Sequence, residues 1–205
     1  MTPLTQITEL KEHLAALRYF PGTSGNLAIR NDVQSLYVTT SGIDKNITHE
    51  DSFVQVDYSG QPIDSLLKPS LETVLHLEIF NRTDAQVSLH VHSVENNVIS
   101  EIYGDDKKVT FKNQELIKAF GLWKENDVLI IPIIENPADV TQLAQLFAQH
   151  VQKDYGVVLI RNHGMNVWGR SKDEALKFLE AAEFLFKYQL QLNAAQYYLH
   201  TLKER

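Results

Sequence analysis

Two histidines, His90 and His92, alternate with apolar residues in the segment "SLHVHS" at positions 88–93. The segment is typical of a β-strand, where successive side chains point to opposite faces, so both imidazoles are expected on one face. Neutral imidazoles a few ångströms apart add little to packing but suit a divalent metal ion. Taken alone, the segment also fits two histidines on a half-exposed strand face.

A third histidine, His163, follows the apolar run in "LIRNHGMNVWG" and precedes Gly164. A loop at the end of a strand would present its side chain. A catalytic zinc commonly takes three protein ligands and leaves one position open, so the three histidines predict a zinc site with one ion per chain. An ordinary turn is the competing interpretation of this segment. The chain has no cysteine, so any tightly held metal must use His, Asp or Glu.

Two carboxylates are candidates for acid/base catalysis. Glu72 lies at the start of an expected helix, with His76 one turn later on the same face. Glu115 lies in "FKNQELIKAF", near the start of a short helix, where an acidic residue is also favourable for the helix itself. Composition does not decide between the two.

Three turns rich in glycine and hydroxyl residues are candidates for binding a phosphate. They are "GTSGN" at 22–26, "TTSG" at 39–42 and "KPS" at 68–70. They lack the spacing of a Walker loop or a dinucleotide fingerprint. Each offers backbone N–H groups or hydroxyls, and Lys68 adds an ammonium group.

The expected elements position these residues on a mainly antiparallel sheet. We expect an N-terminal helix, three hairpin-connected strands, a helix over 71–82 capped by Ser70, and a strand over 87–91. Further strands are expected at 107–111, 128–134 and 155–162, with a helix from Pro137 to about 153 and a long one from 173 to about 199. Strands interleaved with helices but without regular βαβ spacing predict an α/β fold of the α+β type. Its central antiparallel sheet would have helices on both faces, in one domain over 1–205.

The net charge of −7 argues against a nucleic-acid partner, because phosphate neutralisation needs clustered Lys and Arg. The N-terminus lacks the pattern of a signal peptide, and no apolar run approaches the ~20 residues that span a bilayer. We therefore expect a cytoplasmic protein that binds no membrane.

Taken together, the motifs resemble the class II aldolase/adducin family. The matching segments, in order, are "GTSGNLAIR", "TTSGIDK", "LKPSLETVLH", "LHVHS" and "LIRNHG". The resemblance implies a three-layer sandwich, zinc held by His90, His92 and His163, and a sugar-phosphate substrate. It also implies a homotetramer with active sites near subunit interfaces. The implied phosphate site includes Asn26, Ser41, Gly42 and Ser70.

Within the family, "NNVISE", "QELIKA" and "IPIIEN" are most similar to lyases that dehydrate a methylthio-substituted pentulose 1-phosphate in methionine salvage. That similarity implies that Glu115 is the acid/base. In the family's aldolases the working carboxylate corresponds to Glu72. This chain keeps Glu72 but has Leu71 where a second serine is usual, so an aldolase or epimerase remains the alternative.

Overall fold

The computed structural model describes residues 1–203, and one eight-stranded sheet forms the centre of this part of the chain. The strands are β1 (Asn26–Arg30), β2 (Ser35–Thr39), β3 (Phe53–Asp57), β4 (Val87–Val91), β5 (Lys108–Lys112), β6 (Val128–Ile134), β7 (Gly156–Ile160) and β8 (Gly164–Gly169). Their order across the sheet is β3-β2-β1-β4-β8-β7-β6-β5. Neighbouring strands are antiparallel except for β6 and β7, which run parallel. The expected mainly antiparallel sheet is confirmed.

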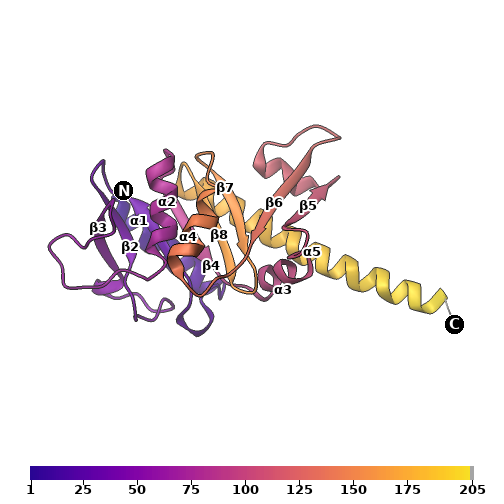
Figure 1. The fold of residues 1–205 in the computed structure, drawn as a ribbon, viewed down its shortest axis with the longest axis horizontal. Coiled ribbons are helices and arrows are strands. Elements are labelled where there is room, and N and C mark those ends of the chain that lie inside the picture. The colour runs from indigo at the N-terminus through magenta and orange to yellow at the C-terminus, as the bar shows by residue number, and fades with distance from the viewer. Residues whose placement is uncertain (204–205) are drawn as a thin grey trace.

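Helices cover both faces of this sheet (Figure 1). The helical elements are α1 (Pro3–Ala16), α2 (Thr73–Arg82), α3 (Val94–Ile102), α4 (Val140–Ala148) and α5 (Lys172–Lys203), with short 3-10 turns η1 (Pro21–Thr23), η2 (Glu50–Ser52) and η3 (Glu115–Phe120). Helices α1 and α5 share one apolar core with the sheet, whereas α2 and α4 share a second core on the other face. The layered arrangement explains why the strands at the centre are buried on both sides.

Strand β4 shows how the sequence serves both cores. Its odd-numbered residues, such as Leu89, belong to the core beneath α1 and α5. The side chains of Ser88 and His90 point to the opposite face, toward α2, and all five strand residues are buried. The alternation predicted from "SLHVHS" therefore places a polar row on the α2 side of an otherwise apolar strand.

Several boundaries differ from the expected ones. Helix α2 begins at Thr73 with Glu72 as its N-cap, and Ser70 contributes its carbonyl to the Thr73 N–H rather than a capping side chain. Helix α4 begins at Val140, because the Asp139 side chain caps the Thr141 N–H, and it ends at Ala148. Strand β8 was not predicted. It forms directly after His163 because a tight turn returns the chain alongside β7.

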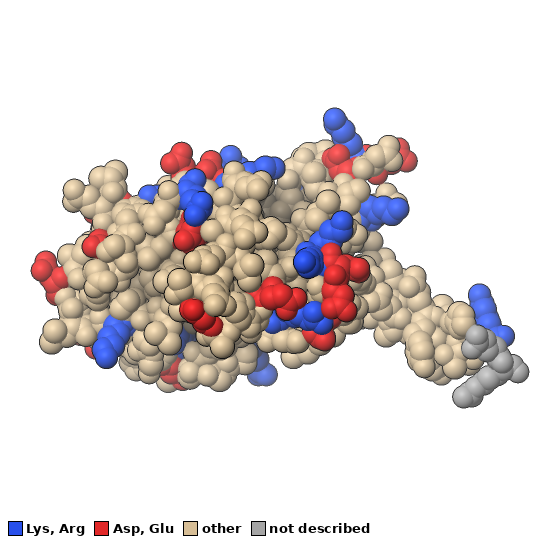
Figure 2. All heavy atoms as spheres, in the orientation of Figure 1, with Lys and Arg blue, Asp and Glu red and all other residues tan. Residues whose placement is uncertain are grey.

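Helix α5 extends far beyond the body of the molecule (Figure 1). Its first half is packed on the sheet, with Phe186 fully buried, whereas Tyr197 and Tyr198 near its end are exposed. On the face shown in Figure 2, basic and acidic side chains are interspersed among other residues. Among residues 1–203, no helix has both the length and the apolar character needed to span a membrane.

Gly156 of β7 gives a test of how tightly the α2 side is packed. A Cβ at this position would overlap the indole ring of Trp168, which is 1% exposed and donates a hydrogen bond from Nε1 to the Lys153 carbonyl. We expect Gly156→Ala to lower the free energy of unfolding by about 1–3 kcal/mol, because overpacking forces the ring or the strand to move. Urea denaturation measures this change, and an unchanged midpoint would contradict it.

Candidate functional site

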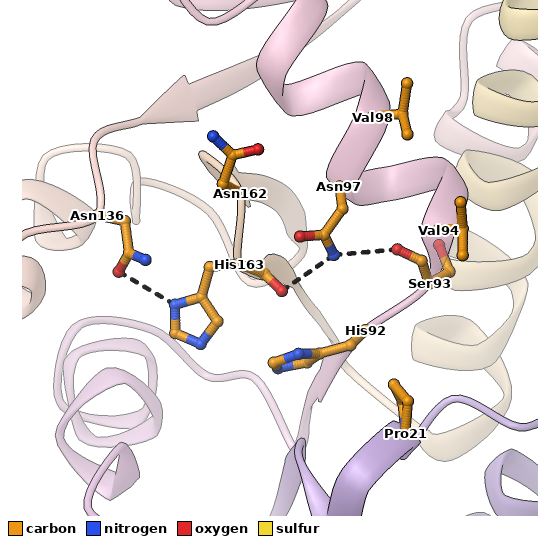
Figure 3. Close-up of a pocket in the computed structure, with 9 residues that line it drawn as sticks. All are labelled: Pro21, His92, Ser93, Val94, Asn97, Val98, Asn136, Asn162 and His163. Atoms are coloured by element: carbon orange, nitrogen blue, oxygen red, sulfur yellow. Dashed lines mark hydrogen bonds between the residues drawn. The ribbon is translucent and has the colours of Figure 1, made fainter.

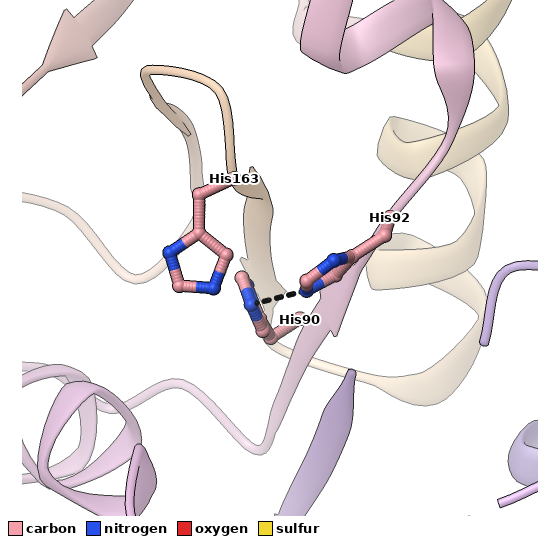
Figure 4. A group of neighbouring side chains, drawn as sticks. All are labelled: His90, His92 and His163. Atoms are coloured by element: carbon pink, nitrogen blue, oxygen red, sulfur yellow. Dashed lines mark hydrogen bonds between the residues drawn. The ribbon is translucent and has the colours of Figure 1, made fainter. Parts of the chain in front are cut away.

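Three imidazoles converge at one end of the sheet (Figure 4). His90 lies near the end of β4, His92 directly follows it, and His163 lies in the turn between β7 and β8. The ring centroids are 4.7 to 5.1 Å apart, and Nε2 of His90 lies 2.9 Å from Nε2 of His92. One nitrogen of each ring lies within 4.8 Å of the other two. The three predicted residues are therefore together, on elements far apart in sequence.

The chemistry of this cluster fits a metal ion. Burial, together with the neighbouring imidazoles, lowers the pKa of His92 to about 3, and burial also lowers the pKa of His90. Neutral imidazoles keep a free lone pair, which is the form that binds a metal. Nitrogens bound tetrahedrally to a zinc-sized ion at 2.0–2.1 Å would be roughly 3.3 Å apart, so only small side-chain movements would be needed.

The outer nitrogens of these rings have partners that can orient them. Nδ1 of His163 lies 3.2 Å from Oδ1 of Asn136, and this contact leaves Nε2 facing the cluster. Nδ1 of His90 is buried without a hydrogen bond, and so are both amide atoms of Asn166, its partner across the β4–β8 pair. A small rotation of Asn166 would let its carbonyl accept the His90 Nδ1–H. Such a bond fixes the tautomer whose Nε2 binds a metal.

Glu72 is in contact with the histidine cluster. Oε1 lies 2.9 Å from Nε2 of His163, and Oε2 lies 3.4 Å from Nε2 of His90. Burial alone would raise the pKa of Glu72, but its interactions with His90, His163 and Asn26 outweigh this effect, so the pKa lies well below its ordinary value. The carboxylate is thus held ionised beside the three imidazoles.

A buried chain of hydrogen bonds fixes this carboxylate. Asn26 donates from Nδ2 to Oε2 of Glu72 at 2.7 Å, and its Oδ1 lies 2.6 Å from Nε2 of His76. Nδ1 of His76 lies 2.7 Å from the Ser88 hydroxyl. Burial lowers the pKa of His76 to about 3, so the ring is neutral, with Nε2 donating to Asn26 and Nδ1 accepting from Ser88. The helical spacing of Glu72 and His76 was visible in the sequence, but this supporting chain was not predicted.

The second predicted carboxylate, Glu115, is not near this cluster. It lies at the start of η3, with its side chain 80% exposed and paired with Lys118 at 2.8 Å. Four strand spacings separate β4 from β5, the strand before η3, so the side chain lies on the order of 20 Å away across the sheet. Within one chain, only Glu72 of the two candidates reaches the histidines.

The structure brings together two of the three turns that were candidates for phosphate binding. The Ser41 N–H donates to the Lys68 carbonyl at 2.8 Å, and the Ser70 N–H donates to the Thr39 carbonyl at 3.0 Å. Ser41, Gly42 and Lys68 are exposed, and Gly42 adopts a positive φ of 75°. The Asn26 side chain is instead committed to Glu72 and His76, so its position is set by the carboxylate.

Lys45 was missed in the sequence, although it lies in the segment "TTSGIDK". It is only 7% exposed, and its charge interacts with those of Asp44 and Glu72. Burial lowers the pKa of Lys45, while the two carboxylates oppose that change. The signal available was a lysine directly after a glycine-containing turn, which alone does not distinguish a buried ammonium from an exposed one.

A pocket of about 510 Å³ adjoins the cluster (Figure 3). His92 and His163 form one end of it, and the lining continues along the first turns of α3. The pocket is lined by Pro21, His92, Ser93, Val94, Asn97, Val98, Asn136, Asn162 and His163. The cluster is therefore accessible to a small molecule.

Gly164 gives a test of how closely the chain approaches the cluster. A Cβ at this position would lie 2.7 Å from the Val91 carbonyl, 2.9 Å from Cδ2 of His92 and 3.1 Å from Cε1 of His90. We expect Gly164→Ala to lower zinc affinity by about 10- to 100-fold, since displaced ligands no longer converge. Competitive titration with a chromophoric chelator measures this affinity.

Gly156→Ala is the matched control for that measurement, because it crowds the same β7–β8 pair at the end away from the histidines. It should cost stability and leave zinc affinity unchanged. Equal zinc affinities in both glycine variants and the wild type would contradict the role given to Gly164.

Known proteins match this chain over almost its whole length. It is 50% identical over 198 residues to the methylthioribulose-1-phosphate dehydratase of Bacillus subtilis strain 168, with 95% of each chain covered. It is 54% identical over 192 residues to the protein of the same name from Exiguobacterium sp. strain AT1b, with 92% of this chain and 94% of the relative covered.

The fold is similar to that of a solved structure. L-fuculose-1-phosphate aldolase from Thermus thermophilus superposes with a TM-score of 0.74 at 19% identity, over 94% of this chain and 96% of that one. The model of the "Class II Aldolase and Adducin N-terminal domain" matches residues 5–190. This chain belongs to the class II aldolase and adducin family.

Proposed function

We propose that this chain is a zinc-dependent lyase of methionine salvage. It would dehydrate 5-methylthioribulose 1-phosphate to 5-methylthio-2,3-dioxopentyl phosphate. The observation that carries the proposal is near full-length identity of about half with dehydratases of that name, in a chain whose three histidines converge. The enzyme would act in the cytoplasm as a homotetramer.

The metal ligands in this proposal are His90, His92 and His163. When bound, zinc supplies a Lewis acid that stabilises negative charge developing on the substrate oxygens. Asn136 and Asn166 would hold the rings of His163 and His90 from behind. The neighbouring Glu72 carboxylate adds one negative charge beside the three imidazoles.

Glu72 is proposed as the base that removes the proton from C3 of the substrate. It is the carboxylate that contacts the histidine cluster, and Asn26 and His76 hold it from one side. Loss of the C3 proton gives an enediolate across C2 and C3. This intermediate then expels the hydroxyl on C4, and the resulting enol relaxes to the 2,3-diketone.

Glu115 is proposed to protonate the departing C4 hydroxyl in the active site of a neighbouring subunit. Its exposed position at the start of η3, after the edge strand β5, is out of reach of its own cluster but open to another chain. The exposed apolar residues near the end of α5, including Tyr197, Tyr198, Leu199 and Leu202, support contacts between chains.

The phosphate of the substrate is proposed to bind where the turns at 39–42 and 68–70 lie side by side. Ser41 and Ser70 would contribute their hydroxyl groups, Gly42 its N–H group, and Lys68 an ammonium group. Asn26 would contribute by fixing the neighbouring carboxylate. Lys45 adds a positive charge on the same side.

Incubation of the zinc-loaded protein with 5-methylthioribulose 1-phosphate tests the proposed reaction. We expect loss of one water by mass spectrometry and appearance of the diketone by ultraviolet absorbance. His90→Ala should lose bound zinc and turnover together, because one ligand of three is removed. Cleavage of a carbon–carbon bond instead of water loss would make the protein an aldolase, and full zinc with full turnover in His90→Ala would remove the metal assignment.

Glu115→Gln tests the second carboxylate. We expect turnover to fall by about 10²- to 10⁴-fold, with fold and zinc content retained, because a positioned proton donor is lost. Lys118→Met is the matched control, since it breaks the same exposed ion pair without touching the carboxyl group. A similar loss in both variants would assign the effect to the ion pair.

Mixed oligomers test whether two chains build one site. Co-expression of His90→Ala and Glu115→Gln chains in equal amounts should restore about one quarter of wild-type activity, because random assembly pairs an intact ligand set with an intact Glu115 in that fraction of sites. Activity no higher than that of the separate variants would place Glu115 and the histidines of a working site in one chain.

A further inference from the structure

The pocket beside His92 and His163 has an apolar side that the proposed reaction steps leave unused. Val94 and Val98 of α3 and Pro21 of η1 line it. None of the residues proposed for phosphate binding lines this pocket. A substrate whose C2 to C4 atoms lie at the histidines, with its phosphate at the two turns, would therefore direct its C5 end into the pocket.

The two valines belong to an exposed apolar row on α3. Val94, Val98 and Ile102 recur every four residues and are 75%, 39% and 51% exposed. Apolar side chains left in water contribute nothing to the core, and a row of them beside a polar site is typical of a ligand contact. Only the first two, which are nearest to His92 in sequence, line the pocket.

Each of the three asparagines that line the pocket has one amide atom engaged with the protein. Asn97 donates to the carbonyls of Ser93 and His163, at 3.0 and 3.1 Å. Oδ1 of Asn136 contacts His163, and Nδ2 of Asn162 donates to Glu101 at 2.7 Å. The pocket thus offers apolar contact more readily than hydrogen bonds, which suits a thioether and disfavours a hydroxyl group.

From these observations we infer that Pro21, Val94 and Val98 form the subsite for the methylthio group of the substrate. The inference rests on the proposed function and adds to it the residues that would select a methylthio-substituted pentulose phosphate. The methyl and sulfur atoms would lie against the two valines, while the asparagines hold the histidine-bearing segments that form the pocket's other wall.

The double variant Val94→Thr/Val98→Thr tests this subsite, since threonine keeps the branched shape and replaces one methyl by a hydroxyl. We expect kcat/KM for 5-methylthioribulose 1-phosphate to fall about 10-fold, the scale of small changes in an apolar pocket. For 5-deoxyribulose 1-phosphate, kcat/KM as a substrate, or the inhibition constant as a competitor, should change less than about 2-fold. Ile102→Thr is the matched control, being on the same face of α3 but outside the pocket, and should match the wild type.

Three results would overturn the subsite while the wild type remains an active dehydratase. These are unchanged kinetics in the double variant, equal losses on both compounds, and loss of zinc from the double variant. A shift to smaller oligomers on size-exclusion chromatography would instead make the row a contact between subunits. A wild type inactive on 5-methylthioribulose 1-phosphate would remove the proposed function itself.

Discussion

The structure depends on holding three imidazoles, with nitrogens within 4.8 Å of one another, and the Glu72 carboxylate beside them at the end of a sheet. Strand β4 makes this possible because its two faces serve different purposes. Leu89 belongs to the core under α1 and α5, and His90 faces α2. Pairing of β4 with β1 and β8 then sets Asn26 and Asn166 opposite His90. A shift of one residue in the pairing of β4 with β1 or β8 would place the side chains of Ser88 and His90 in the apolar core.

Helix α3 connects His92 and His163, the two histidines of the cluster that lie outside the strands. Ser93, next to His92, caps the helix through the Asn96 N–H, and Asn97 donates to the carbonyl of His163. One turn later, the Ser100 hydroxyl accepts the N–H of Asn162. On the other side, Glu183 of α5 accepts hydrogen bonds from Ser93 and Asn96, and burial raises its pKa to about 7. A single helix therefore fixes His92 and His163 relative to each other.

The sequence predicted the parts of the site that follow from local spacing. Alternation placed His90 and His92 on one face, and helical spacing placed Glu72 near His76. Strand β8 was missed because "GMNVWG" is short and begins with a glycine, so its strand character depends on pairing with β4 and β7. The separation of Glu115 from the cluster was also beyond local patterns, since it follows from the order of strands across the sheet.

The two carboxylates differ in how strongly the fold constrains them. A series of hydrogen bonds through Asn26 and His76 links the Glu72 carboxylate to Ser88 of the central strand β4. The carboxylate is therefore fixed relative to the sheet. Glu115 is exposed, and its ion pair with Lys118 adds little to stability, as is usual for surface pairs. The histidine cluster and Glu72 thus belong to the rigid centre, whereas Glu115 lies on the exposed surface. A histidine cluster with one carboxylate suits carbon–carbon cleavage, epimerisation or dehydration alike. The choice among these reactions would therefore rest with the groups that other chains and the α3 pocket bring to the cluster.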